Sequence, residues 1–207
     1  MTGSTYVVLL PVKPPARGKS RLEVDPARRR SLAAAFALDT ARACLGAARV
    51  AAVLAVTDDA RFADDLRAAG CETIPDGVTG NLNESLRQAA AEASRRWPAG
   101  MPVAVCADLP SLLPDDLDAA LGDVSGGGST SAFVADRDGV GTTLYTAEYG
   151  AFDPHFGHHS RQAHLDGGAR EVTLPVGTLR LDVDDRAALA DAVDLGVGAH
   201  TRLALLA

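Results

Sequence analysis

The sequence is poor in cysteine and has no long apolar segment. Its cysteines, Cys44, Cys71 and Cys106, are far apart and form no CxxC pattern. We therefore expect reduced core residues in a cytoplasmic protein. No run approaches the roughly 18 to 20 apolar residues that span a bilayer, and the chain does not open with a basic segment followed by a long apolar one. These absences argue against a membrane segment and against export.

Basic residues are outnumbered as well. The chain has 20 Lys and Arg against 27 Asp and Glu, a formal net charge of -7, which argues against nucleic acid or an anionic membrane as a partner. Its 207 residues, 47% of them hydrophobic, suffice for one sizeable core. We expect a single domain over residues 1–207, with a core at about 5–196 and a C-terminal tail at 197–207. A local cluster of Lys and Arg residues in so acidic a chain therefore marks a candidate binding site.

Short apolar runs alternate with longer helical patterns in the first part of the chain, as in repeated βα units on a mostly parallel sheet. Thr57-Asp58 is expected to cap the second helix and Gly70 to end it. The expected strands cover residues 6–12, 50–56, 71–76 and 102–106, and the expected helices cover about 26–48, 59–70, a segment ending near 97, and one starting near 113.

The pattern changes after Leu121, where "GDVSGGGSTS" predicts a flexible connection. Two further strands, separated only by "DRDGVG", could form a hairpin or a loop insertion. The fold class that follows is α/β, with a mostly parallel mixed sheet flanked by helices. The remaining predictions are strands at 131–135 and 141–146, a short helix within 151–169, strand-like runs at 171–176 and 178–183, a helix from 185 to about 195, and a helical or loosely packed tail at 198–207.

A basic loop, "PVKPPARGKSRLE", follows the first strand. Its Gly-Lys-Ser resembles part of a P-loop, but Lys13 stands where that motif needs a glycine. Side-chain cations in this loop could instead neutralise the phosphates of a nucleotide. The plainer interpretation is a solvated loop whose charges pair with Glu23 and Asp25. The cations are Lys13, Arg17, Lys19 and Arg21.

Aspartates follow two other apolar runs. Asp108 comes directly after a fully apolar strand, a position from which a carboxylate can hold Mg²⁺ against phosphate oxygens. Asp182 and Asp184 are two residues apart, so on a strand they would project from one face and repel each other unless a cation lay between them. The alternative is that Asp108 caps the short helical turn that follows it and that Asp184 or Asp185 caps the next helix.

The histidines at 155, 158, 159 and 164 do not predict a zinc site, because no HExxH pattern or cysteine partner accompanies them. Gly157 and Ser160 are more informative, since a glycine before a helix start can present backbone amides and a hydroxyl to a small anion. The "GTT" at 141–143 could line the same pocket or be ordinary strand threonine.

Five segments in series carry a resemblance to a known family: "LLPVKPPARGKSRL", "ADLPSL", "GVGTTL", "FGHHSRQAH" and "LDVDD". They resemble the guanylyltransferases that make the side-chain precursor of the deazaflavin coenzyme F-420, and the match runs from about Tyr6 to Leu195. The resemblance implies a Rossmann-like nucleotidyltransferase fold and transfer of a guanylyl group from GTP to phosphoenolpyruvate. It implies 2-phospho-L-lactate or 3-phosphoglycerate as alternative acceptors, and a downstream transferase as a possible partner.

The resemblance also implies roles for individual residues. Mg²⁺ would be held by Asp108, Asp182 and Asp184, and phosphoenolpyruvate by Thr142, Gly157 and Ser160. Catalysis would involve Lys13, Lys19, Arg21 and Asp108, and nucleotide contacts would come from Leu10, Pro11, Lys13, Lys19, Pro75 and Asn83. Two rivals stay open: a nucleotidyltransferase with a molybdopterin or sugar-phosphate acceptor, and a non-catalytic nucleotide-binding regulator.

Overall fold

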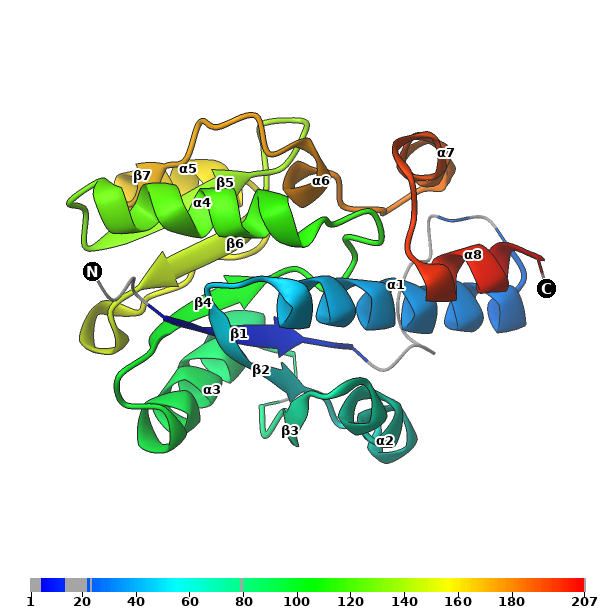
Figure 1. The fold of residues 1–207 in the computed structure, drawn as a ribbon, viewed down its shortest axis with the longest axis horizontal. Coiled ribbons are helices and arrows are strands. Elements are labelled where there is room, and N and C mark those ends of the chain that lie inside the picture. Colours follow the sequence, from blue (N-terminus) through cyan, green and yellow to red (C-terminus); the bar gives the residue numbers. More distant parts are fainter. Residues whose placement is uncertain (1–4, 14–21, 23, 79, 207) are drawn as a thin grey trace.

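A mixed sheet of seven strands forms the centre of the described part of the chain (Figure 1). The computed structural model describes residues 5–13, 22, 24–78 and 80–206. Its strand order is β3-β2-β1-β4-β6-β5-β7. β6 is antiparallel to its neighbours β4 and β5, and the other pairs are parallel. The strands are β1 (Tyr6–Pro11), β2 (Val50–Val56), β3 (Glu72–Ile74), β4 (Met101–Val105), β5 (Ser131–Ala135), β6 (Thr142–Ala147) and β7 (Arg170–Glu171).

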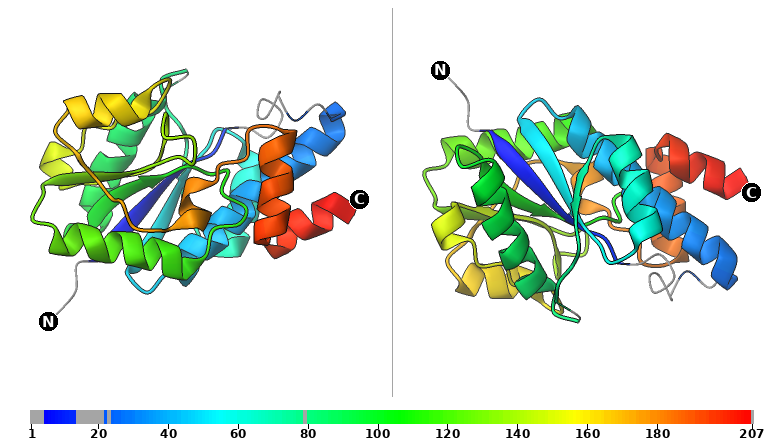
Figure 2. Two further views of the ribbon diagram at one scale, coloured as in Figure 1. Left: turned by 90° about the horizontal axis from the view of Figure 1, so that it is seen from above. Right: turned by 90° about the horizontal axis from the view of Figure 1, so that it is seen from below.

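Helices cover both faces of this sheet (Figure 2). In the apolar clusters, α1, α2 and α4 pack on one face and α3 and α5 on the other, while the first half of α1 packs against α7 and α8. No helix among the described residues is long and apolar enough to cross a membrane. The helices are α1 (Pro26–Gly46), α2 (Ala60–Ala69), α3 (Leu82–Arg96), α4 (Pro114–Gly126), the 3-10 turn η3 (Tyr149–Ala151), α5 (Ser160–Asp166), α6 (Gly177–Arg180), α7 (Arg186–Leu195) and α8 (Ala199–Leu206).

The first βα units follow the local signals of the sequence. β1 and β2 are apolar along their lengths because helices cover both sides of the sheet. Asp25 caps α1 by accepting hydrogen bonds from two backbone N–H groups of the first turn, and Pro26 occupies the first helical position. Gly70 ends α2 with a φ of 108°, a conformation that favours glycine. The predicted strands at about 6–12 and 50–56 and the predicted end of α2 at Gly70 are confirmed.

The predicted cap of α2 is wrong by one residue. Asp59, and not Thr57-Asp58, accepts hydrogen bonds from the N–H groups of the first turn. Asp58 instead contacts the end of β3, where its Oδ1 accepts a hydrogen bond from the backbone N–H of Asp76 at 2.9 Å. This hydrogen bond ties the ends of β2 and β3 together.

The first half of the segment predicted as a flexible connection after Leu121 is helical. α4 continues to Gly126, because Leu121 and Val124 are both buried and keep this turn packed against the sheet. The two strands on either side of "DRDGVG" are confirmed as a hairpin, since β5 and β6 are antiparallel neighbours.

The predicted strand at 178–183 is wrong. Residues Gly177–Arg180 form the short helix α6, since the N–H and hydroxyl of Thr178 both donate to Asp116 Oδ2, at 2.9 and 2.6 Å. Arg180 then donates to the backbone carbonyl oxygens of Ala135 and Val172, which holds α6 against β5. The predicted run at 171–176 contributes only Glu171 to a strand, the two-residue β7.

The C-terminal residues form a packed helix. Asp39 of α1 is buried and caps α8 from the side, because its carboxylate accepts from the N–H groups of His200 and Thr201 at 3.0 and 2.8 Å. Figure 1 shows α8 alongside α1.

The turn after β4, which carries Asp108, is held by two helices. The Leu109 N–H donates to the buried hydroxyl oxygen of Thr40 in α1 at 3.1 Å. The hydroxyl of Ser111 donates to the carbonyl oxygen of Ala192 in α7 at 2.9 Å. The position of Asp108 therefore depends on contacts with segments far away in the sequence.

We predict that Thr40→Val destabilises the protein. The substitution keeps the shape of the side chain but leaves the buried Leu109 N–H without its acceptor, which costs about 1–3 kcal/mol. Urea unfolding monitored by circular dichroism measures the change. The control is Thr173→Val at an exposed loop position, which should change stability by less than about 0.5 kcal/mol. Equal stability of the two variants would contradict the role of Thr40.

Candidate active site

Polar residues that follow three parallel strands lie at one edge of the sheet. β1, β4 and β5 all end there, and the antiparallel β6 begins there. Lys13 follows β1, Asp108 follows β4, and Asp136 follows β5, while Thr142 opens β6. In open α/β sheets this edge is where ligands bind.

Asp108, Asp182 and Asp184 come together at this edge. Each offers a carboxylate oxygen, and these oxygens all lie within 4.8 Å of one another. The Val183 N–H donates to the carbonyl oxygen of Asp108 at 3.0 Å, which fixes the segment 181–184 beside the end of β4. Val183 and Leu181 are buried, so the two aspartates project to the opposite side of this extended segment. The donors, all carboxylate oxygens, fit a hard divalent cation.

The electrostatics of the cluster also fit a cation. Burial, followed by the charges of Asp108 and Asp184 and a smaller contribution from Asp136, raises the pKa of Asp182 to about 7. The polypeptide thus holds these carboxylates together at an electrostatic cost. A divalent cation bound between them would offset that repulsion.

The predicted acid-binding residues lie in or directly after two loops that contact each other, since Thr142 follows the β5–β6 turn and Ser160 follows the loop that carries Gly157. The Arg161 N–H donates to the carbonyl oxygen of Val140 at 3.1 Å, which joins the turn before β6 to the start of α5. Gly157 has a φ of 137°, a conformation that favours glycine, and it precedes Ser160 by one tight turn. Thr142 and Ser160 are both buried. The structure thus brings the two loops together, and their contact with an acid stays a prediction.

The predicted nucleotide contacts are more scattered. Leu10 is buried in β1, Pro11 ends that strand, and Lys13 is exposed after it. Pro75 is exposed at the end of β3. Lys19 and Arg21 lie outside the described residues.

Asn83 contacts the segment that precedes Gly157. Its side-chain amide donates to the carbonyl oxygen of Phe156 at 3.0 Å and accepts from the Phe156 N–H at 2.8 Å. Asn83 therefore anchors the chain directly before Gly157. Its contact with a nucleotide stays a prediction.

Asp136 is a residue of this edge that the sequence analysis missed. Its carboxylate accepts from the N–H groups of Val140 and Gly141, at 2.9 and 2.7 Å, and so shapes the turn between β5 and β6. The signal was available, because Asp136 is the first polar residue after an apolar strand, as Asp108 is.

Curated proteins resemble this chain over nearly its whole length, although no family model matches it. A phosphoenolpyruvate guanylyltransferase of Thermomonospora curvata is 43% identical over 95% of this chain and 87% of its own. The chain belongs to this family. Proteins of the same name from Frankia casuarinae and Streptomyces scabiei are each 41% identical, covering 99% and 96% of this chain and 78% and 95% of their own. The protein is thus a nucleotidyltransferase.

Solved structures show the same fold at low sequence identity. A putative nucleotide-diphospho-sugar transferase from Desulfovibrio desulfuricans G20 gives a TM-score of 0.63 at 16% identity, over 93% of this chain and 96% of that one. The CMP:2-keto-3-deoxy-manno-octonic acid synthetase structure with CTP gives 0.60 at 17% identity, over 93% and 98%. A Mycobacterium tuberculosis H37Rv protein in complex with manganese gives 0.54 at 20% identity, over 92% and 99%. These similarities confirm the predicted nucleotidyltransferase fold.

We predict that Asp182→Asn stabilises the metal-free protein at pH 8. The raised pKa of Asp182 means that the folded state binds more protons than the unfolded state between about pH 4 and pH 7, so wild-type stability falls as pH rises through this range. Asparagine removes that charge. The Tm in EDTA should therefore exceed the wild-type value at pH 8, by roughly 2–4 °C for each kcal/mol of repulsion relieved.

With Mg²⁺ at pH 8, the wild-type Tm should instead exceed that of Asp182→Asn, because the variant has lost one carboxylate ligand and gains less stability from the cation. For wild type, the gain from Mg²⁺ should be larger at pH 8 than at pH 6, because the cation binds the deprotonated carboxylate. Thermal melts with EDTA or Mg²⁺ at both pH values measure these differences. Asp138→Asn, at an exposed aspartate of the β5–β6 turn, serves as the control. A lower Tm for Asp182→Asn than for wild type in EDTA at pH 8 would contradict the prediction.

Proposed function

We propose that the protein transfers the guanylyl group of GTP to phosphoenolpyruvate. An oxygen of the phosphoenolpyruvate phosphate forms a bond to the α-phosphorus of GTP, and the bond from that phosphorus to the α,β-bridging oxygen breaks. Pyrophosphate leaves, and enolpyruvyl-2-diphospho-5'-guanosine remains. The observation that carries the proposal is the cluster of Asp108, Asp182 and Asp184 at the ligand-binding edge of a chain that belongs to this family.

In this proposal the three aspartates hold Mg²⁺. When bound, this cation would neutralise negative charge on the phosphates. The chemistry of the aspartates supports a divalent cation, as does the fold neighbour crystallised with manganese. The chain itself then needs no general base, because the attacking phosphate is already an anion near neutral pH. Catalysis depends on alignment and on charge neutralisation.

The other residues bind the two substrates. Lys13, Lys19 and Arg21 face the phosphates of GTP, and the guanosine lies near Leu10, Pro11, Pro75 and Asn83. Thr142, Gly157 and Ser160 bind the three-carbon acid. The small, buried side chains of Thr142 and Ser160 support a compact anion more than a pterin or a sugar. The free cysteine thiols and the proposed substrates, GTP and phosphoenolpyruvate, support a cytoplasmic location. If the product is labile, a downstream transferase that consumes it is the expected partner.

Pyrophosphate release tests the proposal directly. The purified protein is incubated with GTP and Mg²⁺ and with phosphoenolpyruvate, 2-phospho-L-lactate or 3-phosphoglycerate in parallel. We expect release with phosphoenolpyruvate. Release with another acid alone would reassign the acceptor and keep the reaction. Binding of GTP without release, even when a product-consuming transferase is added, would favour a nucleotide-binding regulator.

We predict that Asp108→Ala lowers turnover by about 10²-fold or more, because a metal ligand that acts on the transferring phosphate is lost. The fold should persist, since the backbone carbonyl that accepts from Val183 remains. Steady-state pyrophosphate release measures turnover, and circular dichroism checks folding. Asp138→Ala is the matched control. Near-normal turnover of a folded Asp108→Ala protein would remove Asp108 from the metal site.

A further inference from the structure

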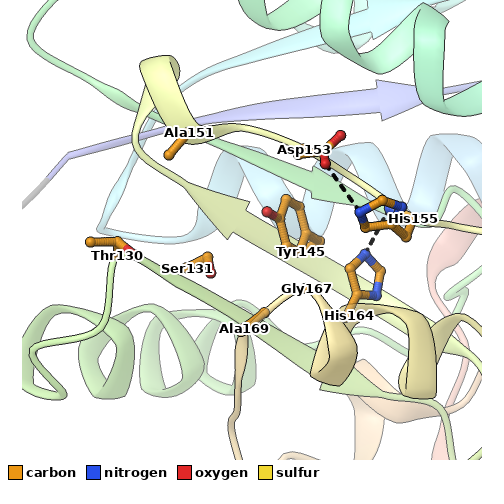
Figure 3. A pocket seen from close by; sticks show the side chains of 9 residues that line it. All are labelled: Thr130, Ser131, Tyr145, Ala151, Asp153, His155, His164, Gly167 and Ala169. Atoms are coloured by element: carbon orange, nitrogen blue, oxygen red, sulfur yellow. Dashed lines mark hydrogen bonds and ion pairs between the residues drawn. The ribbon is translucent and has the colours of Figure 1, made fainter.

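A buried histidine lies between Thr142, a predicted acid-binding residue, and a small cavity. Figure 3 shows this cavity with the residues that line it. His164 of α5 borders this cavity of about 140 Å³, together with Tyr145, Asp153 and His155. Its ring stacks on Tyr145 and Phe133, with centroid distances of 4.6 and 5.5 Å. Because aromatic rings pack against it and it is nearly inaccessible to solvent, the imidazole has little freedom to turn.

The hydrogen bonds of His164 determine which ring nitrogen carries the proton. The backbone N–H of His155 donates to Nε2 at 3.0 Å. A backbone N–H can only donate, so Nε2 must be the unprotonated nitrogen, and in a neutral imidazole Nδ1 then carries the hydrogen. Burial, and next the neighbouring His155, lower the pKa of His164 to about 4, so the ring is neutral at neutral pH. A hydrogen bond with the backbone of Ser160 acts in the opposite direction and raises the pKa of His164, as expected where a ring nitrogen carries a hydrogen.

The protonated nitrogen faces Thr142. Nδ1 of His164 lies 3.0 Å from Thr142 Oγ1, and both side chains are buried. Since Nδ1 carries the hydrogen, Thr142 can only accept at this contact. The hydroxyl hydrogen of Thr142 must then point elsewhere, and the described residues supply no second partner for it.

A strand irregularity places Thr142 in this position. The pairing of β5 with β6 shifts register, so that Val134 faces Leu144 and Ala135 faces Thr142, while Thr143 is left over. A bulge of this kind re-aims a side chain at the end of a strand. Thr142 thereby meets α5, where His164 lies.

We propose that His164 is a positioning residue for the acceptor acid, acting by holding the Thr142 hydroxyl as a hydrogen-bond donor directed at that anion. This inference rests on the proposed function, in which Thr142 contacts the three-carbon acid. If Thr142 instead donated to an unprotonated Nδ1, it would turn only oxygen lone pairs toward an anionic ligand. That arrangement is prevented because the His155 N–H donates to Nε2 of His164, so that Nδ1 carries the hydrogen and donates to the Thr142 hydroxyl oxygen.

The first test needs no activity. Long-range ¹H–¹⁵N spectra of the ¹⁵N-labelled enzyme at neutral pH report the tautomer of each imidazole, and His164→Asn identifies the signals of His164. We expect Nδ1 to be protonated and Nε2 to be free, and we expect the Nδ1–H signal to shift in Thr142→Val. A neutral ring protonated at Nε2 would overturn the inference, whatever the substrate is.

The second test is a double-mutant cycle on the acceptor that wild type uses. His164→Phe keeps an aromatic ring but removes the donor to Thr142, so KM for the acid should rise about 10- to 100-fold, as expected for a lost hydrogen bond to a charged group, while KM for GTP changes less than about 2-fold. In a Thr142→Val background the same change should add less than about 2-fold, because His164 acts through that hydroxyl. His164→Asn, whose amide can donate in place of Nδ1, should recover most of the affinity.

Each result has a single meaning. Multiplicative effects of His164→Phe and Thr142→Val on KM for the acid, or an unchanged KM in folded His164→Phe, would overturn the positioning role. A wild-type enzyme that uses none of the three acids would contradict the proposed function instead, and the tautomer measurement would still decide the inference. If His164→Phe does not fold, His164→Asn and the spectra carry the test.

Discussion

The hydrogen bond from the Val183 N–H to the Asp108 carbonyl oxygen joins the two segments that carry the acidic cluster. Burial of Leu181 and Val183 reinforces it, since each buried aliphatic side chain contributes roughly 1.5–3 kcal/mol and a net hydrogen bond about 0.5–1.5 kcal/mol. Together these terms hold Asp182 and Asp184 near Asp108 despite their repulsion. The core thus stabilises an arrangement of charges that would otherwise separate, and a cation bound between the carboxylates would reduce their repulsion.

The antiparallel direction of β6 determines what else reaches this edge. Because β6 begins where β4 and β5 end, the β5–β6 turn and Thr142 both lie beside the aspartates. A parallel strand in that place would have put its first residue at the opposite edge of the sheet. One hairpin thus brings Thr142, a predicted acid-binding residue, next to the predicted metal site. The start of α5 joins this hairpin through the hydrogen bond from the Arg161 N–H to the Val140 carbonyl oxygen.

The sequence was informative where local rules decide the structure. Continuous apolar runs predicted the buried strands, and Asp108 lies just after β4 at the carboxyl edge of the sheet, as predicted. Asp182 and Asp184 were expected on a strand, which is wrong, but an extended backbone still alternates its side chains, so they share a side as predicted. α6 could not be predicted, since it depends on a hydrogen bond between Thr178 and Asp116. The pairing of His164 with Thr142, 22 residues apart, gave no local signal either.

Asp136 acts on both the β5–β6 turn and the aspartates, and its hydrogen bonds explain why three carboxylates of the described residues, and not four, form the cluster. Both of its oxygens accept backbone N–H groups, from Val140 and Gly141, and so are directed into the β5–β6 turn. The turn is so close that a Cβ on Gly141 would collide with Asp136 Oδ2, so a side chain there would push the carboxylate away. Asp136 nevertheless adds its charge to those that raise the pKa of Asp182. Asp136, which shapes the β5–β6 turn, therefore also adds to the repulsion that a cation at the three aspartates would offset.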